Sequence, residues 1–252
     1  MIELREASVV VPTGEGQATI LQPTTLSLGE HRISIIGGNG SGKSTLARLC
    51  NGLIEPSTGA VLVGAGSRGV GTPGDGIESS GIGDSAPLDT VRDGAAVRRL
   101  VGFVFSDASA QLIMPTVAED VALSLRRTHR RKADRLSTAQ TVLERFGLHH
   151  LADRSVHTLS GGQKQLLAVA AVLATDPAIL VADEPTTLLD LRNARMIGDL
   201  LMSLPQQVVL VTHDLDLAAR ADRTLVIDDG RVVFDGEPAA AVAHYRDRVA
   251  LP

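Results

Sequence analysis

The chain has 252 residues and a formal net charge of −5, with 24 Lys and Arg against 29 Asp and Glu. This balance argues against broad electrostatic binding of nucleic acid or anionic lipid, and an aromatic content of 2% leaves few rings for base stacking. No nucleic-acid partner is therefore expected. Because Cys50 is the single cysteine, an internal disulfide and a cysteine-rich metal site are excluded.

The first residues carry charges and no long apolar region, so a signal peptide is not expected. The most apolar run, 166–174, is less than half of the roughly 20 residues that cross a bilayer. Any membrane contact is expected to come through partner proteins.

Strand and helix patterns alternate along most of the chain. Strands are predicted at 3–11, 32–36, 60–63, 101–105, 179–182, 208–211, 224–227 and 231–234, and helices at 43–51, 118–127, 135–146, 162–175 and 191–203. The alternation predicts an α/β fold, and the aliphatic runs at 179–182 and 208–211 are typical of parallel strands covered on both faces. Asp228-Asp229-Gly230 predicts a hairpin turn between the last two strands.

Two segments differ from this pattern. Residues 64–87 are rich in Gly and Ser and predict a flexible surface insertion. The segment from Arg126 to Arg135 also contains Arg130, Arg131 and Lys132. It is either a solvated face between two helices or a surface that lies near acidic headgroups or a partner subunit.

A glycine-rich loop follows the strand at 32–36 and precedes a helical pattern. It consists of Gly37, Gly38, Asn39, Gly40, Ser41, Gly42, Lys43, Ser44 and Thr45. This strand–loop–helix order fits the G-x-x-x-x-G-K-[ST] phosphate-binding pattern, in which backbone N–H groups and the helix dipole attract phosphate oxygens. Lys43 is predicted to contact the β- and γ-phosphates and Ser44 to be a ligand of Mg²⁺.

Asp183 and Glu184 directly follow the aliphatic strand at 179–182. The carboxyl edge of such a sheet is where ligands bind. Asp183 is predicted to hold Mg²⁺, and Glu184 to orient and polarise the attacking water. Neighbouring strand residues point in opposite directions, so we expect two distinct roles.

A second anion site is predicted at Ser160, Gly161, Gly162 and Gln163, before an apolar helical pattern. Ser160 can cap that helix, and the two glycines leave its first amides open. Since one chain needs one phosphate loop, this segment is predicted to serve a nucleotide bound by another copy. His213 follows the strand at 208–211 and is a candidate to sense the γ-phosphate and hold the attacking water.

The order of these motifs, with Asp190 between them, resembles the ATPase subunits of ABC transporters over nearly the whole chain. The resemblance implies a P-loop NTPase α/β fold with a mainly parallel core sheet, an antiparallel β portion and a helical signature subdomain. It implies one domain over 1–252, in which 1–105 and 177–252 form the nucleotide-binding core and 106–176 the helical part. The implied cofactors are ATP and Mg²⁺.

In that family two ATP molecules lie between the phosphate loop of one subunit and the signature segment of the other. The resemblance therefore implies that residues 160–163 act in trans and that Asp190 lies at a dimer interface. It implies catalytic roles for Lys43, Glu184 and His213. The second ATPase subunit is either an identical or a different chain.

The segment 111–121 is similar to the ATPases of energy-coupling-factor importers, and the segments 105–107 and 188–193 look most like the biotin branch. This implies uptake of a micronutrient, with a transmembrane coupling protein and a substrate-binding membrane protein as partners. The ATPase would lie in the cytoplasm at the inner face of the cell membrane. Import of cobalt, nickel or another vitamin, and a non-transport ABC ATPase, are the alternatives.

Two positions depart from the family. Ser106 stands where relatives carry a Gln that contacts Mg²⁺ and reports to the membrane subunit, so that role could pass to Asp107 or Gln111. Val10, Val11 and Pro12 stand near the place where relatives have an aromatic ring against adenine. Loss of that stacking predicts modest affinity and comparable binding of ATP and GTP.

Overall fold

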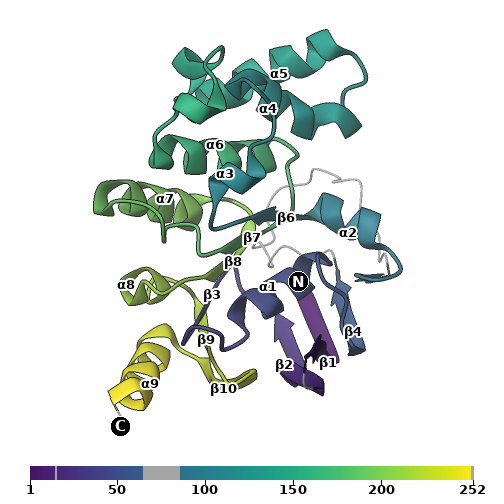
Figure 1. Cartoon of the computed structure of the whole chain (residues 1–252), viewed down its shortest axis with the longest axis vertical. Coiled ribbons are helices and arrows are strands. Elements are labelled where there is room, and N and C mark those ends of the chain that lie inside the picture. The colour runs from purple at the N-terminus through teal and green to yellow at the C-terminus, as the bar shows by residue number, and fades with distance from the viewer. Residues whose placement is uncertain (15, 65–85, 251–252) are drawn as a thin grey trace, which may run out of the picture.

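The computed structural model describes residues 1–14, 16–64 and 86–250. Two β-sheets and their helices make up one part of the molecule, and a mostly helical part lies above it in the view of Figure 1. The flexible insertion predicted at 64–87 falls outside the described residues, except for its ends.

A six-stranded sheet forms the centre of the molecule, in the order β10-β9-β3-β8-β7-β6. All neighbours are parallel except β10 and β9, which form the hairpin predicted at Asp228-Asp229-Gly230. Every residue of β3 and β7 is buried, as expected for strands covered on both faces. The strands are β3 (Arg32–Gly37), β6 (Val101–Val104), β7 (Ile179–Asp183), β8 (Gln207–Val211), β9 (Arg223–Asp228) and β10 (Arg231–Gly236).

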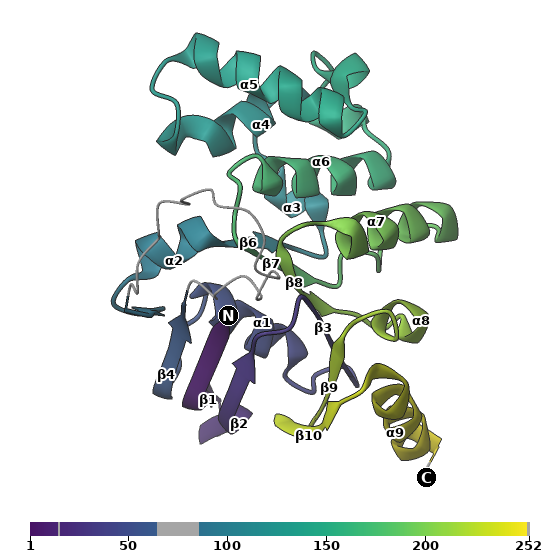
Figure 2. The ribbon, with the colours of Figure 1, turned by 180° about the vertical axis from the view of Figure 1, so that it is seen from behind.

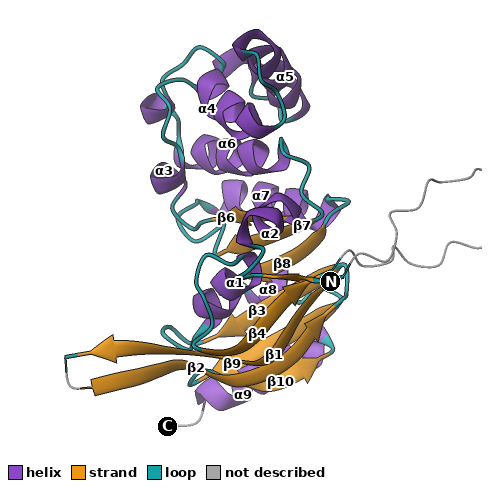
Figure 3. Cartoon of the chain, turned by 90° about the vertical axis from the view of Figure 1, so that its right-hand side faces the viewer, coloured by secondary structure: helices purple, strands orange, loops and turns teal. Residues whose placement is uncertain are grey.

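A four-stranded antiparallel sheet packs beside it, in the order β2-β1-β4-β5. Its strands are β1 (Ile2–Thr13), β2 (Gly16–Leu28), β4 (Thr58–Val63) and β5 (Leu88–Asp89). The β1–β2 hairpin extends beyond the body of the molecule in Figure 3. Strand β2, which lies at the edge of this sheet, was not predicted from the sequence.

Helices cover both faces of the central sheet. Helix α1 (Lys43–Asn51) contributes Leu46 and Leu49 to a core shared with both sheets. On the opposite face, α7 (Leu191–Ser203) contributes Ile197 and Leu201 to a core with β7 and β8. Three further helices pack around this unit: α2 (Gly94–Leu100), α8 (Leu215–Ala218) and α9 (Pro238–Ala250).

The helical part has its own apolar core, which includes Val121, Leu143 and Leu167. Its helices are α3 (Ala108–Gln111), α4 (Val117–Ser124), α5 (Lys132–Arg145) and α6 (Gly161–Leu173). The helix predicted at 118–127 ends at Ser124 and continues as a 3-10 turn over Leu125–Arg127. In the described part of the chain, no helix is both long and apolar enough to cross a membrane.

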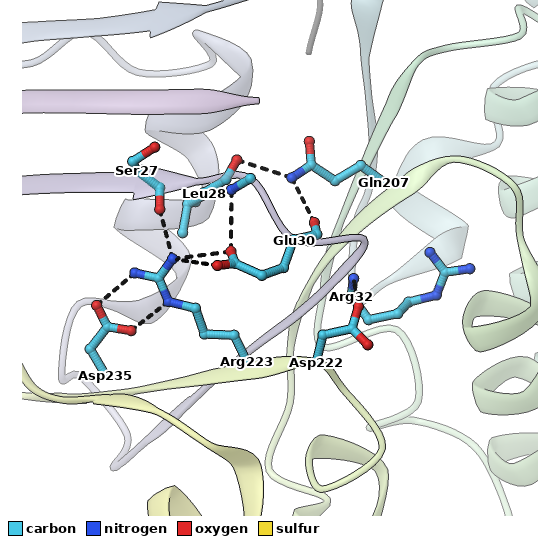
Figure 4. A network of polar contacts seen from close by, with 9 residues as sticks. Ser27, Leu28, Glu30, Arg32, Gln207, Asp222, Arg223 and Asp235 are labelled. Atoms are coloured by element: carbon cyan, nitrogen blue, oxygen red, sulfur yellow. Dashed lines mark hydrogen bonds and ion pairs between the residues drawn. The ribbon is translucent and has the colours of Figure 1, made fainter. Parts of the chain in front are cut away.

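A polar network joins the two sheets at the amino ends of β3, β8 and β9 (Figure 4). Arg223 pairs with Glu30 and Asp235, and Gln207 donates to the carbonyls of Leu28 and Glu30 at 3.0 and 2.9 Å. These carboxylates raise the pKa of Arg223. The opposite edge of the sheet, where the strands end, carries the predicted site residues.

Candidate nucleotide-binding site

The carboxyl ends of three neighbouring strands bring the predicted site residues together. The glycine-rich loop follows β3, Asp183 ends β7 and Glu184 follows it, and His213 follows β8, which lies between β3 and β7. This position is the usual ligand edge of an open parallel sheet.

Two glycines of the loop are required by its shape. Gly37 has φ 150°, and a Cβ on it would lie 2.0 Å from the carbonyl oxygen of Ile227. Gly42 has φ 105°, and its Cβ would lie 2.8 Å from the carbonyl oxygen of Ile20. Gly42 also precedes α1 without a side-chain cap, so the first amides of that helix are open to a ligand.

Lys43 and Ser41 present donors inside this loop. Lys43 is 5% exposed, and its Nζ donates to the carbonyls of Gly37 and Gly38 at 2.9 and 2.7 Å. Burial lowers the pKa of Lys43, while Glu184 and Asp183 oppose that shift. The buried Ser41 Oγ has no hydrogen-bond partner among the described residues. An unpaired hydroxyl and a buried ammonium, beside the open first amides of α1, fit a polyphosphate.

Ser44 and Asp183 place a hydroxyl and a carboxylate side by side. Ser44 Oγ donates to Asp183 Oδ1 at 2.8 Å, and Arg48 lies 3.7 Å from Asp183 Oδ2. Mg²⁺ in nucleotide sites takes one or two protein oxygens and completes its shell with phosphate oxygens and water. The residues present therefore fit this ion.

Glu184 has a left-handed backbone conformation, which the sequence pattern does not predict. Strand β7 ends at Asp183, and Glu184 has φ 52°, in the left-handed region. Strand alternation therefore does not extend to Glu184. The two carboxylates have different neighbours: Asp183 contacts Ser44, whereas Glu184 contacts Thr187 and His213. Thr187 Oγ1 donates to Glu184 Oε2 at 2.8 Å, which fixes the carboxylate. This role of Thr187 was not predicted from the sequence.

His213 and Glu184 meet at this edge. His213 Nε2 lies 2.9 Å from Glu184 Oε1, but the pair is not aligned as a hydrogen bond. Within the described residues, the buried Glu184 Oε1 accepts no hydrogen bond. A buried carboxylate oxygen that has no hydrogen-bond donor and lies next to an imidazole is suited to hold a water molecule.

The signature segment begins α6 and faces outward. Ser160 Oγ accepts from the N–H of Gln163 at 3.3 Å, and Gln163 Oε1 accepts from the N–H of Ser160 at 2.9 Å, a capping box. Ser160 and Gly161 are exposed. Among the described residues, neither a hydrogen bond nor an ion pair joins this segment to the phosphate loop of the same chain.

Asp190 is connected to the signature segment through Asn193, which contacts both Asp190 and Gly162. Asp190 caps α7 and accepts from Asn193 Nδ2 at 2.7 Å. A Cβ on Gly162 would lie 2.4 Å from Asn193 Oδ1, so Gly162 allows the two helices to touch. Leu188 and Leu191, on either side of Asp190, are 69% and 68% exposed.

The loop after β6 is held by two glutamines. Gln111 Oε1 accepts from the N–H of Phe105 at 3.1 Å, and the buried Gln165 of α6 donates to the carbonyl of Phe105 at 3.3 Å. Asp107 caps α3. Ser106 makes no side-chain hydrogen bond with the described residues. Gln165 was missed because its position inside an apolar helix gives no sign of this contact.

The ABC transporter family matches residues 21–187 of this chain. A putative ABC transporter ATP-binding protein of Deinococcus radiodurans is 42% identical over 252 residues, which is 100% of both chains. The chain belongs to the ABC transporter family. As predicted, this cassette is an ATPase whose turnover is coupled to transport.

Two further relatives have more specific names. The biotin transport ATP-binding protein BioM of Rhizobium etli is 40% identical to the cassette over 235 residues, 93% of this chain and 95% of that protein. The energy-coupling factor transporter ATP-binding protein EcfA1 of Lactiplantibacillus plantarum is 38% identical over 216 residues, 84% of this chain and 69% of that protein.

Solved structures confirm the predicted fold class. The cassette resembles cbiO1 from Clostridium perfringens, part of the ABC transporter complex cbiONQ, with a TM-score of 0.74 and 29% identity over 100% of this chain and 95% of that one. It also resembles the dimeric cassette MJ0796 bound to ADP and Pi, with a TM-score of 0.76 and 29% identity over 94% and 99% of the two chains.

Proposed function

We propose that this cassette is the ATP-hydrolysing subunit of an energy-coupling-factor importer and that its transporter imports biotin. The observation that carries the proposal is the convergence of Lys43, Asp183, Glu184 and His213 at one edge of the sheet, next to an open phosphate loop. Similarity to a biotin transport ATPase at 40% identity and to EcfA1 at 38% supports the importer class and its substrate.

Each residue of the edge has a role in this proposal. The loop amides, Ser41 and Lys43 bind the phosphates of ATP, and Ser44 and Asp183 hold Mg²⁺, which neutralises phosphate charge when bound. Glu184 Oε1 accepts a hydrogen bond from the attacking water, and His213 keeps the carboxylate and that water in place. The left-handed backbone at Glu184 follows the end of β7, and the carboxylate of Glu184 lies beside Thr187 and His213.

A second copy completes the site. Ser160, Gly161, Gly162 and Gln163 form a capped helix start, and Ser160 and Gly161 are exposed there to a ligand held by another copy. Binding of one γ-phosphate by the loop of one copy and the signature segment of the other makes ATP favour the closed pair. Asp190 and the exposed Leu188 and Leu191 lie in the same interface.

The decisive experiment is Glu184→Gln, with Glu144→Gln as a control on an exposed carboxylate of α5. Removal of the base should reduce ATP turnover by roughly 10²- to 10⁴-fold, while ATP still binds and a nucleotide-trapped dimer accumulates on gel filtration. Turnover close to wild type in Glu184→Gln would remove Glu184 from this role.

The loop at Ile113 and Met114 is the proposed contact with a membrane coupling protein. Ile113 is 71% exposed, and the N–H groups of Ile113 and Met114 both donate to the buried Asp120 Oδ1, at 2.9 and 3.0 Å. An apolar side chain held out by a buried carboxylate is suited to a partner helix. Through this contact the ATPase would lie peripherally on the inner face of the membrane.

Crosslinking can test this contact because the protein has a single, inert thiol. Cys50 is buried, which raises its pKa to about 12. A bifunctional thiol reagent on Met114→Cys should capture a membrane subunit, while the same reagent on wild type should not. Equal capture, or none, would count against the loop as the docking site.

Biotin uptake by cells that express the cassette with its membrane partners tests the substrate. Cells with the wild-type cassette should take up labelled biotin, and cells with Glu184→Gln should not. Import of cobalt, an alternative that the sequence resemblance left open, is the second candidate, so labelled cobalt is measured in parallel. Cobalt uptake without biotin uptake would replace the substrate and leave the ATPase mechanism intact.

A further inference from the structure

The segment from Arg126 to Arg135, called here the basic segment, concentrates positive charge in the connection between α4 and α5. It holds six cations and one carboxylate, Asp134. Its formal charge is therefore +5, whereas the whole chain carries −5, so the remaining residues together carry −10. The cations are Arg126, Arg127, Arg130, Arg131, Lys132 and Arg135.

These cations are exposed and lack acidic partners. All are exposed except Arg135, which is partly buried and donates to the carbonyls of His129 and Arg130. In the part of the chain that the structure describes, no carboxylate oxygen lies within 4.0 Å of any of the six charged groups. A solvated helix face that is stabilised by ion pairs would show such contacts.

The basic segment borders a shallow cavity of about 170 Å³. Arg126, Lys132 and Arg135 supply its charged lining, and Met114, Leu123 and Leu136 supply apolar lining. Glu119 also lines it, but its carboxylate already accepts a hydrogen bond from Thr116 Oγ1 at 2.8 Å. Cations beside apolar side chains match a phosphate headgroup with its glycerol and first acyl carbons.

We propose that the basic segment binds the phosphate headgroups of anionic membrane lipids. Met114, which lines the cavity, belongs to the loop that is proposed above to contact the membrane subunit. The orientation of the basic segment toward the membrane rests on that proposed function, whereas its binding of lipid phosphate does not. Helix α2, with the exposed Arg98 and Arg99, lies on the same side of the molecule as the α4–α5 connection (Figures 1 and 2). Cations spread over two elements suit a plane of lipid charge better than one carboxylate of a protein.

The test uses the purified full chain, without nucleotide or partner, and vesicle co-sedimentation. Vesicles of phosphatidylcholine alone are compared with vesicles that also contain phosphatidylglycerol. Arg130→Gln with Arg131→Gln removes two charges from the basic segment, and Arg231→Gln with Arg246→Gln removes two exposed charges from β10 and α9. None of these residues belongs to the proposed nucleotide site.

Wild type and the β10–α9 control should bind the phosphatidylglycerol vesicles and be released by high salt. Each charge lost from the basic segment should weaken partitioning about fivefold, which gives roughly 25-fold for the pair. Equal binding to both vesicle types, or equal loss in the control pair, would overturn the proposal. Unchanged lipid binding by the basic-segment variant would also overturn the proposal. If that variant at the same time loses capture of the membrane subunit, the segment recognises protein carboxylates instead of lipid phosphates.

ATP turnover of both double variants is measured in parallel. It should equal that of wild type, which shows that both fold. Because lipid binding is measured without ATP, a failure of the ATPase proposal leaves this result unaffected, and a failure to bind lipid leaves the ATPase proposal standing.

Discussion

Val11, at the end of β1, has no aromatic side chain to offer a base. The Val11 side chain is 36% exposed. Of the five Phe and Tyr rings in the chain, Phe103 and Phe105 pack against each other, with 4.7 Å between their ring centroids. ATP and GTP should therefore compete for the protein within a few-fold of each other. Val11→Tyr should tighten ATP binding by about 5- to 150-fold, if one stacked base contributes about 1–3 kcal/mol. Competition against a fluorescent nucleotide measures both, and strong adenine preference in wild type would contradict the interpretation.

Arg32 stabilises the start of β3 from a buried position. It is 6% exposed, its side chain donates to the carbonyls of Met202, Gln206 and Leu204, and its N–H donates to Asp222 at 2.7 Å. Arg32→Met would leave these carbonyls, in the last turn of α7 and just after it, without the guanidinium donors, which should lower the free energy of unfolding by about 3 kcal/mol. Urea unfolding of Arg32→Met against Arg246→Met checks this. A loss below about 0.5 kcal/mol would show that water replaces the guanidinium.

Among the elements, α4 carries the most informative buried carboxylate. Burial raises the pKa of Asp120, although the N–H groups of Ile113 and Met114 oppose this shift. The folded state therefore holds a proton more tightly than the unfolded state, so the contribution of Asp120 to stability falls as pH rises through its folded pKa. Asp120→Asn keeps an oxygen for both N–H groups without the buried charge.

Asp120→Asn should thus be more stable than wild type near pH 7, and this advantage should fade as the pH approaches about 4. Urea unfolding across this range tests the sign. Asp120→Ala, which loses both hydrogen bonds, is the control and should be less stable than Asp120→Asn by about 2 kcal/mol at every pH, because neither of these side chains titrates. An Asn advantage that grows toward low pH would contradict the assignment.

How well each element could be predicted depended on where its signals lay. The buried strands β7 and β8 followed from continuous aliphatic runs, and the site residues from motifs placed at their ends. Strand β2 was missed because Pro23 interrupts its pattern, yet an edge strand tolerates a proline that cannot donate a ladder bond. Helix α9 was missed although Glu237 accepts from the N–H groups of Ala239 and Ala240 before an alanine-rich run.

The candidate site was predictable in its members but not in its geometry. No sequence pattern predicts the left-handed φ of Glu184 or the hydrogen bond from Thr187 to its carboxylate, because both depend on the geometry of the turn that follows β7. The contact of Gln165 with Phe105 likewise depends on the packing of α6 against β6. These contacts join segments distant in sequence or depend on tertiary packing, which local patterns do not encode.

At the scale of the whole molecule, the proposed shared site predicts complementation between two inactive variants. Lys43→Ala disables a phosphate loop, and Gly161→Asp places a negative charge at the signature segment, where a Cβ meets nothing closer than 3.8 Å. Each variant alone should be inactive. A one-to-one mixture forms dimers with one intact site and should regain up to about a quarter of wild-type turnover. Gly161→Ala is the control, and full activity of Gly161→Asp alone would contradict a site shared between copies.

The exposed Leu188 and Leu191 have a consequence for how the cassette is switched on. In dilute solution two free copies seldom meet, so turnover per molecule should climb with protein concentration before it levels off. Docking of two copies on one transporter would tether them, which raises their effective concentration to the millimolar scale without any new contact. Assembly alone could then keep ATP from being consumed by cassettes that have no transporter to drive.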